Sequence, residues 1–270
     1  MDTANPSFAN PLQPGANLKR RLASGETCVG SFVKVPSPDM VEILAGAGMD
    51  FVVADAEHGP ITPETCQQMA RAAEACGMPL IVRVGEIGSP GTVNRFLDTG
   101  VAGVKLPHIS SPEAAREHLD EVLYPPEGKR GLAGGRWARY GTAQPLHQLV
   151  EEFKSSFVIV AQIEEVEAVE RLDELLELEE PDVFLVGPTD LASSMGLRGD
   201  KSDRRVRELV DETLKRIVAA GRTAGALASS PAEATALIEL GVRYLVFNGE
   251  SLVQWGARLG LEAAKGRVSP

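Results

Sequence analysis

The feature that most constrains the fold of this chain is a regular alternation of short apolar runs with segments of helical spacing. Such alternation is typical of parallel strands joined by crossover helices. Most of the runs are continuously apolar, as expected of strands that are covered on both faces. The expected strands are Val29–Lys34, Phe51–Asp55, Leu80–Val84, Gly103–Leu106, Phe157–Ile163, Val183–Val186, Thr223–Leu227 and Tyr244–Phe247.

The number of strands and the chain length together indicate one closed barrel. The 270 residues lie near the ~250 typical of a (β/α)8 barrel, so we predict an α/β fold, a (β/α)8 TIM barrel with parallel strands. We expect a single barrel domain over residues 17–266, after a flexible N-terminal tail over residues 1–16 that is rich in Pro, Asn and Ala. Helix starts are expected after four N-cap residues that precede proline, Ser37, Thr62, Ser111 and Ser230.

The charge and the cysteines limit the partners and the compartment. Lys and Arg number 27 against 38 Asp and Glu, and the net charge of -11 argues against nucleic acid or an anionic membrane as a partner. Three cysteines cannot all pair, which fits a reducing cytoplasm. The N-terminus does not resemble a signal peptide, and no apolar run approaches the roughly 20 residues of a membrane helix. A cytoplasmic location is therefore expected.

Two consecutive expected strands deliver carboxylates at their carboxyl ends. Glu164 follows one strand directly, and a Gly187-Pro188 turn after the next leads to Asp190. Two such carboxylates repel each other unless a cation lies between them, so a divalent metal site is the leading hypothesis. Alternatively, each acid only caps the helix that follows it.

Two further polar groups stand at strand ends, where barrel enzymes place reactive groups. Asp55 lies three residues before His58, so it could orient the imidazole of a general base. The alternative is a loop histidine near capping acids. Arg83, embedded among branched aliphatic residues, must meet carboxylates either of a ligand or of a buried structural ion pair.

For other polar residues, the sequence allows several interpretations. Lys105 could form a Schiff base with a carbonyl substrate, or it could pair with an acid or reach solvent. His118 and His147 are expected at the surface. The Gly/Pro/Arg-rich segment Tyr124–Pro145 lacks the spacing of a phosphate loop, and we expect it to be a flexible, basic loop over the barrel mouth.

Taken together, these residues resemble the class II pyruvate aldolases of the HpcH/HpaI family, which cleave 4-hydroxy-2-oxo acids into pyruvate and an aldehyde. The likeness covers nearly the whole chain. The motifs that carry it are LAGAGMD at 44–50, DAEHGP at 55–60, VRV at 82–84, LDTG at 97–100, YPPEGKRG at 124–131, AQIE at 161–164 and GPTDLASSMG at 187–196.

The resemblance implies a lyase that depends on a divalent cation, Mg²⁺, Mn²⁺ or Co²⁺. It assigns the metal to Glu164 and Asp190. Pyruvate would be bound by Gln162 and by the turn that delivers Asp190, with its residues Gly187, Pro188 and Thr189. A citrate-lyase-type or malyl-CoA-lyase-type enzyme and a siderophore citrate-synthase-like enzyme are alternatives on the same barrel. A non-catalytic barrel that binds a 2-oxo acid is a third.

The resemblance also assigns the catalytic groups and an assembly. His58 would be the base and Arg83 would stabilise the enolate. Asp55 would support the histidine together with Asp98 of a neighbouring subunit. The implied assembly is a homohexamer, a trimer of dimers in which the last helix is exchanged.

The chain departs from its relatives at three places. Lys105 and His108 stand where apolar residues are common, and the 130–141 loop differs in composition. Because the metal, Arg83 and the 187–190 turn would account for the polar atoms of pyruvate, extra cations such as Arg136 predict an anionic or hydroxylated aldehyde.

Overall fold

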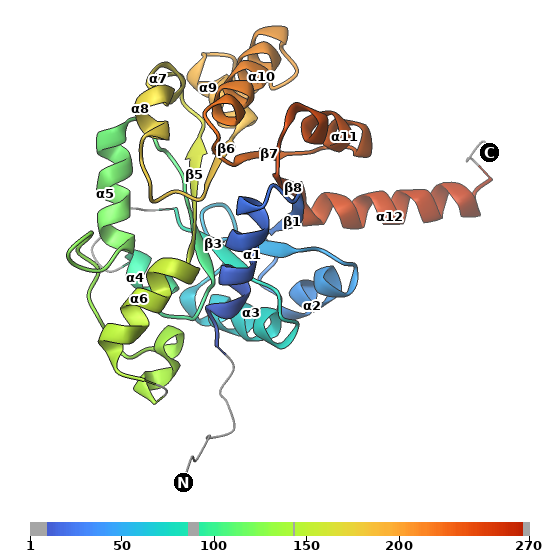
Figure 1. Cartoon of the computed structure of the whole chain (residues 1–270). Helices are drawn as coiled ribbons and strands as arrows, with labels where there is room; N and C mark the ends of the chain where they lie inside the picture. The colour runs from blue at the N-terminus through green and yellow to red at the C-terminus, as the bar shows by residue number, and fades with distance from the viewer. Residues whose placement is uncertain (1–9, 86–91, 143, 267–270) are drawn as a thin grey trace.

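The computed structural model of the chain describes residues 10–85, 92–142 and 144–266. Eight parallel strands follow one another in chain order and close into a barrel, since β1 pairs with both β2 and β8 (Figure 1). The strands are β1 Cys28–Val33, β2 Phe51–Asp55, β3 Leu80–Arg83, β4 Gly103–Leu106, β5 Val158–Ile163, β6 Val183–Val186, β7 Ala224–Leu227 and β8 Tyr244–Asn248. The predicted (β/α)8 TIM barrel is confirmed, with strand ends within one residue of those expected.

Helices surround the barrel and alternate with the strands (Figure 1). They are α1 Gln13–Ala23, α2 Pro38–Gly46, α3 Pro63–Ala75, α4 Thr92–Leu97, α5 Pro112–Val122, the 3-10 helix η1 Arg136–Gly141, α6 Leu146–Ser156, α7 Val166–Glu170, α8 Leu172–Leu176, α9 Pro188–Ser194, α10 Arg204–Ala219, α11 Pro231–Leu240 and α12 Gly249–Ala264. The predicted caps are confirmed: the side-chain oxygens of Ser37, Thr62, Ser111 and Ser230 each accept a backbone N–H three residues later.

The core has two layers, one inside the barrel and one between strands and helices. Phe51 and Tyr244 stack inside, with ring centroids 4.2 Å apart. A side chain at Gly30 would place its Cβ 2.3 Å from the Phe51 ring, so only glycine fits there. Leu18 and Leu22 of α1 join this inner layer. Helix α1 therefore closes the amino end of the barrel.

Helix α1 begins at Gln13, within the range that the sequence assigned to the tail. Leu12 and Pro14 are buried, and Gly15 packs against the carbonyl oxygens of Ala102 and Ser156. Residues 10–16 thus belong to the packed structure, because burying Leu12 and Leu18 favours an ordered chain over a solvated one. Residues 1–9 lie outside the described ranges.

The long basic loop does not lie over the mouth, and that expectation is wrong. Arg136 is buried against Glu74 in the last turn of α3, and it donates to the carbonyl oxygen of Thr99. Since α3 runs antiparallel to the strands, its last turn lies at the amino end of the barrel. Arg130 and Trp137 are also buried. The composition of a loop does not tell which end of the barrel it covers.

The last helix, α12, leaves the barrel and extends away from it (Figure 1). Val253, Leu259 and Leu261 are more than half exposed, and Gly249 is the only buried residue of the helix. At helical spacing these three side chains lie on different sides of α12, and exposed large apolar side chains of this kind are typical of a contact surface. Within the described ranges, no helix combines the length and apolar character needed to cross a membrane.

Candidate active site

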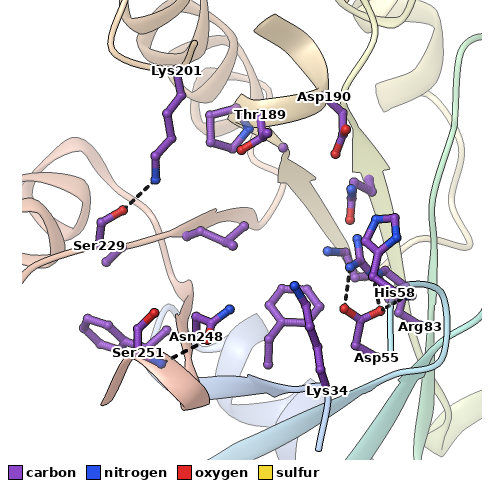
Figure 2. Close-up of a pocket in the computed structure, with 18 of the residues that line it drawn as sticks. Lys34, Asp55, His58, Arg83, Thr189, Asp190, Lys201, Ser229, Asn248 and Ser251 are labelled. Carbon is purple, nitrogen blue, oxygen red and sulfur yellow. Dashed lines mark hydrogen bonds and ion pairs between the residues drawn. The ribbon is translucent and has the colours of Figure 1, made fainter. Parts of the chain in front are cut away.

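A cavity of about 430 Å³ opens at the carboxyl ends of the strands. Its volume lies within the ~300–1,000 Å³ range of small-molecule sites. Figure 2 shows Asp55, His58, Arg83 and Asp190 together on one side of it. The residues singled out from the sequence that line this cavity are Asp55, His58, Arg83, Lys105, Gln162, Gly187, Pro188, Thr189 and Asp190.

The strand register brings three charged side chains to one level of the barrel. Asp55 on β2 pairs in register with Arg83 on β3, which pairs with Lys105 on β4. Residues in register on neighbouring parallel strands face the same side of the sheet. The three side chains therefore point into the same cavity.

Asp55 and Arg83 form a buried bidentate pair. Arg83 Nε donates to Asp55 Oδ1 at 3.0 Å, and Nη2 donates to Oδ2 at 2.7 Å. Arg83 Nη1 also lies 3.0 Å from Glu57 Oε2. Burial by itself raises the pKa of Asp55, but hydrogen bonds and charge from Arg83 outweigh it and lower the pKa. Arg83 therefore forms the buried ion pair that was one interpretation of its sequence position, and its guanidinium also lines the cavity.

The imidazole of His58 is free to meet a ligand. Its side chain is 53% exposed, and Nε2 lies 3.9 Å from Glu57 Oε2. Asp55 accepts from the backbone N–H of His58 at 3.2 Å and does not contact the ring. Asp55 thus holds the backbone of the loop that carries His58. The expected contact between Asp55 and the imidazole ring does not form within this chain.

Glu164 and Asp190 approach each other at the ends of β5 and β6. Glu164 is buried and accepts the backbone N–H of His108 at 2.8 Å. Burial raises the pKa of Glu164 to about 7, and the charge of Asp190 adds to the increase. Neither acid caps a helix, because α7 begins at Val166 and α9 at Pro188. The capping alternative is therefore excluded for both.

The donor atoms at this position suit a hard cation. Among the described residues, the carboxylate of Asp190 has no hydrogen-bond or ion-pair partner, and Gln162 Oε1 is buried without one. Gln162 Nε2 contacts Glu164 Oε2. A Cβ at Gly187 would lie 3.0 Å from that same oxygen, so glycine leaves room beside it. In the described part of the chain, no group of three His, Cys, Asp or Glu side chains is arranged so that it could hold a metal ion by itself. Mg²⁺ is commonly held by one or two carboxylates, with water and substrate completing its coordination.

Lys105 is buried beneath the cavity without an acidic partner in contact. Its Nζ lies 4.1 Å from the centroid of the Phe32 ring, and Arg83 Cζ lies 5.0 Å from the same centroid. Burial, followed by the charge of Arg83, lowers the pKa of Lys105 well below its ordinary value. Of the readings offered by the sequence, the one in which Lys105 reaches solvent is excluded.

His108 lies beside the acids and has a positive φ of 53°. Its Nε2 is 3.2 Å from Glu57 Oε1, and its Nδ1 is 3.4 Å from Glu165 Oε1. Burial favours the neutral ring, but Glu164, Glu57 and Glu165 outweigh it and raise the pKa of His108. His108 thus lies in contact with three acids, an arrangement that its sequence position did not reveal.

Some residues named from the sequence do not line the cavity, and they include Glu164 and His108 as well as Asp98 and His118. Asp98 follows α4, and its Oδ1 accepts from the buried Arg130 Nη2 at 2.8 Å. His118, expected at the surface, is partly buried on α5, and burial lowers its pKa to about 4. Within one chain, the structure therefore does not bring Asp98 to the other catalytic candidates.

The sequence analysis missed the opposite side of the cavity. Lys201 and Ser229, in the loops after α9 and β7, and Asn248, the last residue of β8, line it, and Lys34 after β1 lies between the two sides (Figure 2). Lys34 was included in the first expected strand, and its position at the carboxyl end was a usable signal. Lys201 and Ser229 lie in loops whose sequence contains no comparable signal.

Acids, an arginine and a histidine around one mouth are the arrangement of a barrel enzyme, and sequence comparison identifies its class as carbon–carbon lyases. Residues 29–256 match the HpcH/HpaI aldolase/citrate lyase family. The chain is 33% identical over 266 residues to 4-hydroxy-2-oxovalerate aldolase of Novosphingobium aromaticivorans, covering 94% of this chain and 99% of the relative. It is 31% identical over 251 residues to 2-keto-3-deoxy-L-rhamnonate aldolase of Klebsiella pneumoniae, covering 92% and 90%.

One solved structure shares about as much sequence with this chain as these two relatives do. The citrate synthase SbnG has a TM-score of 0.79 and 30% identity to this chain, covering 93% of it and 99% of SbnG. The chain belongs to the HpcH/HpaI aldolase/citrate lyase family. Its relatives are named aldolases, which are carbon–carbon lyases.

Proposed function

We propose that this chain is a class II aldolase that forms and cleaves 4-hydroxy-2-oxo acids through the enolate of pyruvate. The observation that carries the proposal is the pair Glu164 and Asp190: the charge of Asp190 helps to raise the pKa of the buried Glu164, and the carboxylate of Asp190 lines the cavity with no ion-pair partner among the described residues. The names of two relatives, both aldolases of 2-oxo acids, support it. A divalent cation is the partner that such a pair requires.

In this proposal, Glu164, Asp190 and the buried Oε1 of Gln162 hold the cation and the 2-oxo acid. A bound cation supplies Lewis acidity, which makes the methyl protons next to the keto group removable near neutral pH. Backbone and side-chain atoms of Gly187, Pro188 and Thr189 form the wall beside the acid.

The remaining groups of the chain move the proton and stabilise charge. His58 takes the proton from the methyl carbon, directly or through water, since its ring is exposed to the cavity. Arg83 stabilises the negative charge that develops on the enolate oxygen. Asp55 keeps Arg83 in place through the bidentate pair, so that the guanidinium needs no rearrangement during the reaction.

We also propose that the working enzyme is an oligomer. The exposed apolar side chains of α12 lie around the helix, and exchange of the helix with a neighbouring copy would cover them. Asp98 would then act at the site of a neighbouring copy, because Arg130 fixes it outside the cavity of its own chain. A homohexamer built as a trimer of dimers is the expected assembly.

A second candidate is condensation to a tricarboxylate, which the similarity to the citrate synthase SbnG favours. Pyruvate with a panel of aldehydes, compared with citrate-forming substrates and with and without Mg²⁺, Mn²⁺ or Co²⁺, separates the two activities. A non-catalytic barrel is expected to have lost a base or a metal ligand, and this chain has both His58 and the acid pair.

The direct test of the proposal is metal binding by calorimetry. Glu164→Gln and Asp190→Asn should each weaken binding and remove most turnover while keeping the fold, since each removes a ligand charge at nearly constant volume. Glu165→Gln is the matched control, because this neighbouring acid also contacts His108 but is 34% exposed, whereas Glu164 is buried. Unchanged metal binding in both ligand variants would refute the site.

A further inference from the structure

The cavity has a second wall that the proposed pyruvate chemistry does not use. Lys34, Lys201 and Ser229 form it, and we refer to these three residues as the basic wall. Figure 2 shows Lys201 and Ser229 on the side of the cavity away from Asp55, Arg83 and Asp190, with Lys34 between the two sides. The basic wall therefore faces the space that a second reactant would fill.

The ammonium groups of the basic wall are not paired with acids. Lys201 Nζ donates to Ser229 Oγ at 2.9 Å, and among the described residues neither Lys34 nor Lys201 forms an ion pair. The nearby acids bind backbone instead: Glu250 accepts from Lys34 N at 2.8 Å, and Glu233 accepts from Ser229 N at 2.6 Å. These contacts brace the wall and leave the ammonium groups facing the cavity.

Lys34 and Lys201 line the same cavity in a chain where acids exceed bases by 38 to 27. A cavity that gathers cations attracts a negatively charged ligand. The metal position and Arg83 already satisfy the carboxylate and keto oxygens of pyruvate in the proposed reaction. The charge on the basic wall is therefore available to the other reactant, the aldehyde.

The chemistry of the wall fits a phosphate ester. Two ammonium groups match a dianion, and the hydroxyls of Ser229 and Ser251 with the amide of Asn248 supply further neutral donors at the same side. In (β/α)8 barrels, the loops after strands 7 and 8 frequently form a phosphate site, and Ser229 and Asn248 stand at those two loops. Leu227 and Phe247 offer apolar contact to a carbon chain between the two sides.

Resting on the aldolase function proposed above, we propose that the basic wall binds the phosphate of a short phosphorylated aldehyde. The aldehyde carbon would then lie toward His58 and Arg83, with its phosphate held by Lys34 and Lys201. The cations that select the aldehyde are thus these two lysines, and not Arg136, which is buried at the other end of the barrel.

Binding is tested first, without turnover. Calorimetry compares glycerol 3-phosphate with glycerol on wild type, Lys34→Gln, Lys201→Gln and the double variant. A charge-assisted hydrogen bond contributes about 1.5–3 kcal/mol, so each single variant should weaken glycerol 3-phosphate binding by roughly 10-fold or more. Lys215→Gln, on the exposed face of α10, is the control and should bind as wild type. Binding that is absent in wild type, or unchanged in the double variant, overturns the proposal.

Turnover is then compared for aldehydes that differ in their charged group. With pyruvate, glyceraldehyde 3-phosphate should exceed glyceraldehyde in kcat/KM, and the double variant should remove the difference while pyruvate C3 proton exchange stays within a few-fold of wild type. A higher kcat/KM for 4-oxobutanoate than for glyceraldehyde 3-phosphate overturns the phosphate assignment. If wild type does not exchange the C3 protons of pyruvate, the aldolase function is refuted. That outcome is distinct from failure of the basic wall, because glycerol 3-phosphate binding tests the basic wall alone.

Discussion

Replacing Asp55 by Asn should destabilise the fold through Arg83. The variant keeps the volume of the side chain but removes the charge that meets Arg83 in two hydrogen bonds, of 3.0 and 2.7 Å. Removing one partner of a buried ion pair costs about 3–5 kcal/mol, because the other charge is left uncompensated. Glu57 remains 3.0 Å from Arg83 Nη1, so the expected loss in the free energy of unfolding is about 3 kcal/mol.

The assay is urea unfolding at a fixed protein concentration, applied to Asp55→Asn, Arg83→Met and the double variant. The double variant should lose less than the sum of the two single losses, because removing both charges leaves neither one unpaired. A loss below about 1 kcal/mol for Asp55→Asn, or strictly additive losses, would refute the reasoning, since a pair that matters must couple.

The same pair predicts a pH dependence with a definite sign. The pKa of Asp55 is lowered in the folded state, although burial opposes the shift, because Arg83 stabilises the carboxylate. The contribution of the pair is therefore complete above the unfolded pKa of about 3.9 and is lost as the pH falls through the folded value. Wild type should lose stability below about pH 4 more steeply than Asp55→Asn. Parallel curves for the two proteins would contradict this assignment.

The remaining predictions concern the proposed reaction and the basic loop. Chelation should abolish aldol activity, and Mg²⁺, Mn²⁺ or Co²⁺ should restore it. Borohydride added with pyruvate should leave the enzyme active, and a pyruvyl adduct on Lys105 in mass spectra would instead assign a Schiff base. His58→Ala should slow proton exchange at pyruvate C3 by roughly 10²–10⁴-fold with a smaller effect on pyruvate affinity; wild-type exchange would show that another group moves the proton. Arg136→Leu should lower the melting temperature, because it leaves Glu74 unpaired, and should not change the ranking of aldehydes. An altered ranking of aldehydes with unchanged stability would indicate that this loop lies at the mouth of the barrel after all.

Local patterns in the sequence were sufficient for the architecture. The eight apolar runs predicted the strands to within one residue, because a strand covered on both faces must be apolar along its length. The Ser or Thr before proline predicted four helix starts, since the cap bond joins residues only three apart. The same logic gathered Asp55, Arg83 and Asp190 at one mouth, because carboxyl ends of parallel strands meet there.

The same reasoning could not predict which side chains contact each other. Asp55 was expected to orient His58, three residues away, but it binds Arg83 on the next strand, because register places those two side chains at one level. His108 and Glu164 meet from β4 and β5 and are 56 residues apart in the chain. Such contacts depend on how strands pair around the barrel, which a local pattern does not contain.

By itself, the sequence determined the barrel, its direction and the acids and bases available at the strand ends, because each of these follows from periodicity or from chain order. Only the tertiary structure decided which charges remain unpaired. It buried Arg136 against Glu74 at the amino end and left Lys34 and Lys201 facing the cavity. The physical reason is that loops of similar composition can lie at either end of a barrel, and their charges are matched by neighbours from distant parts of the chain.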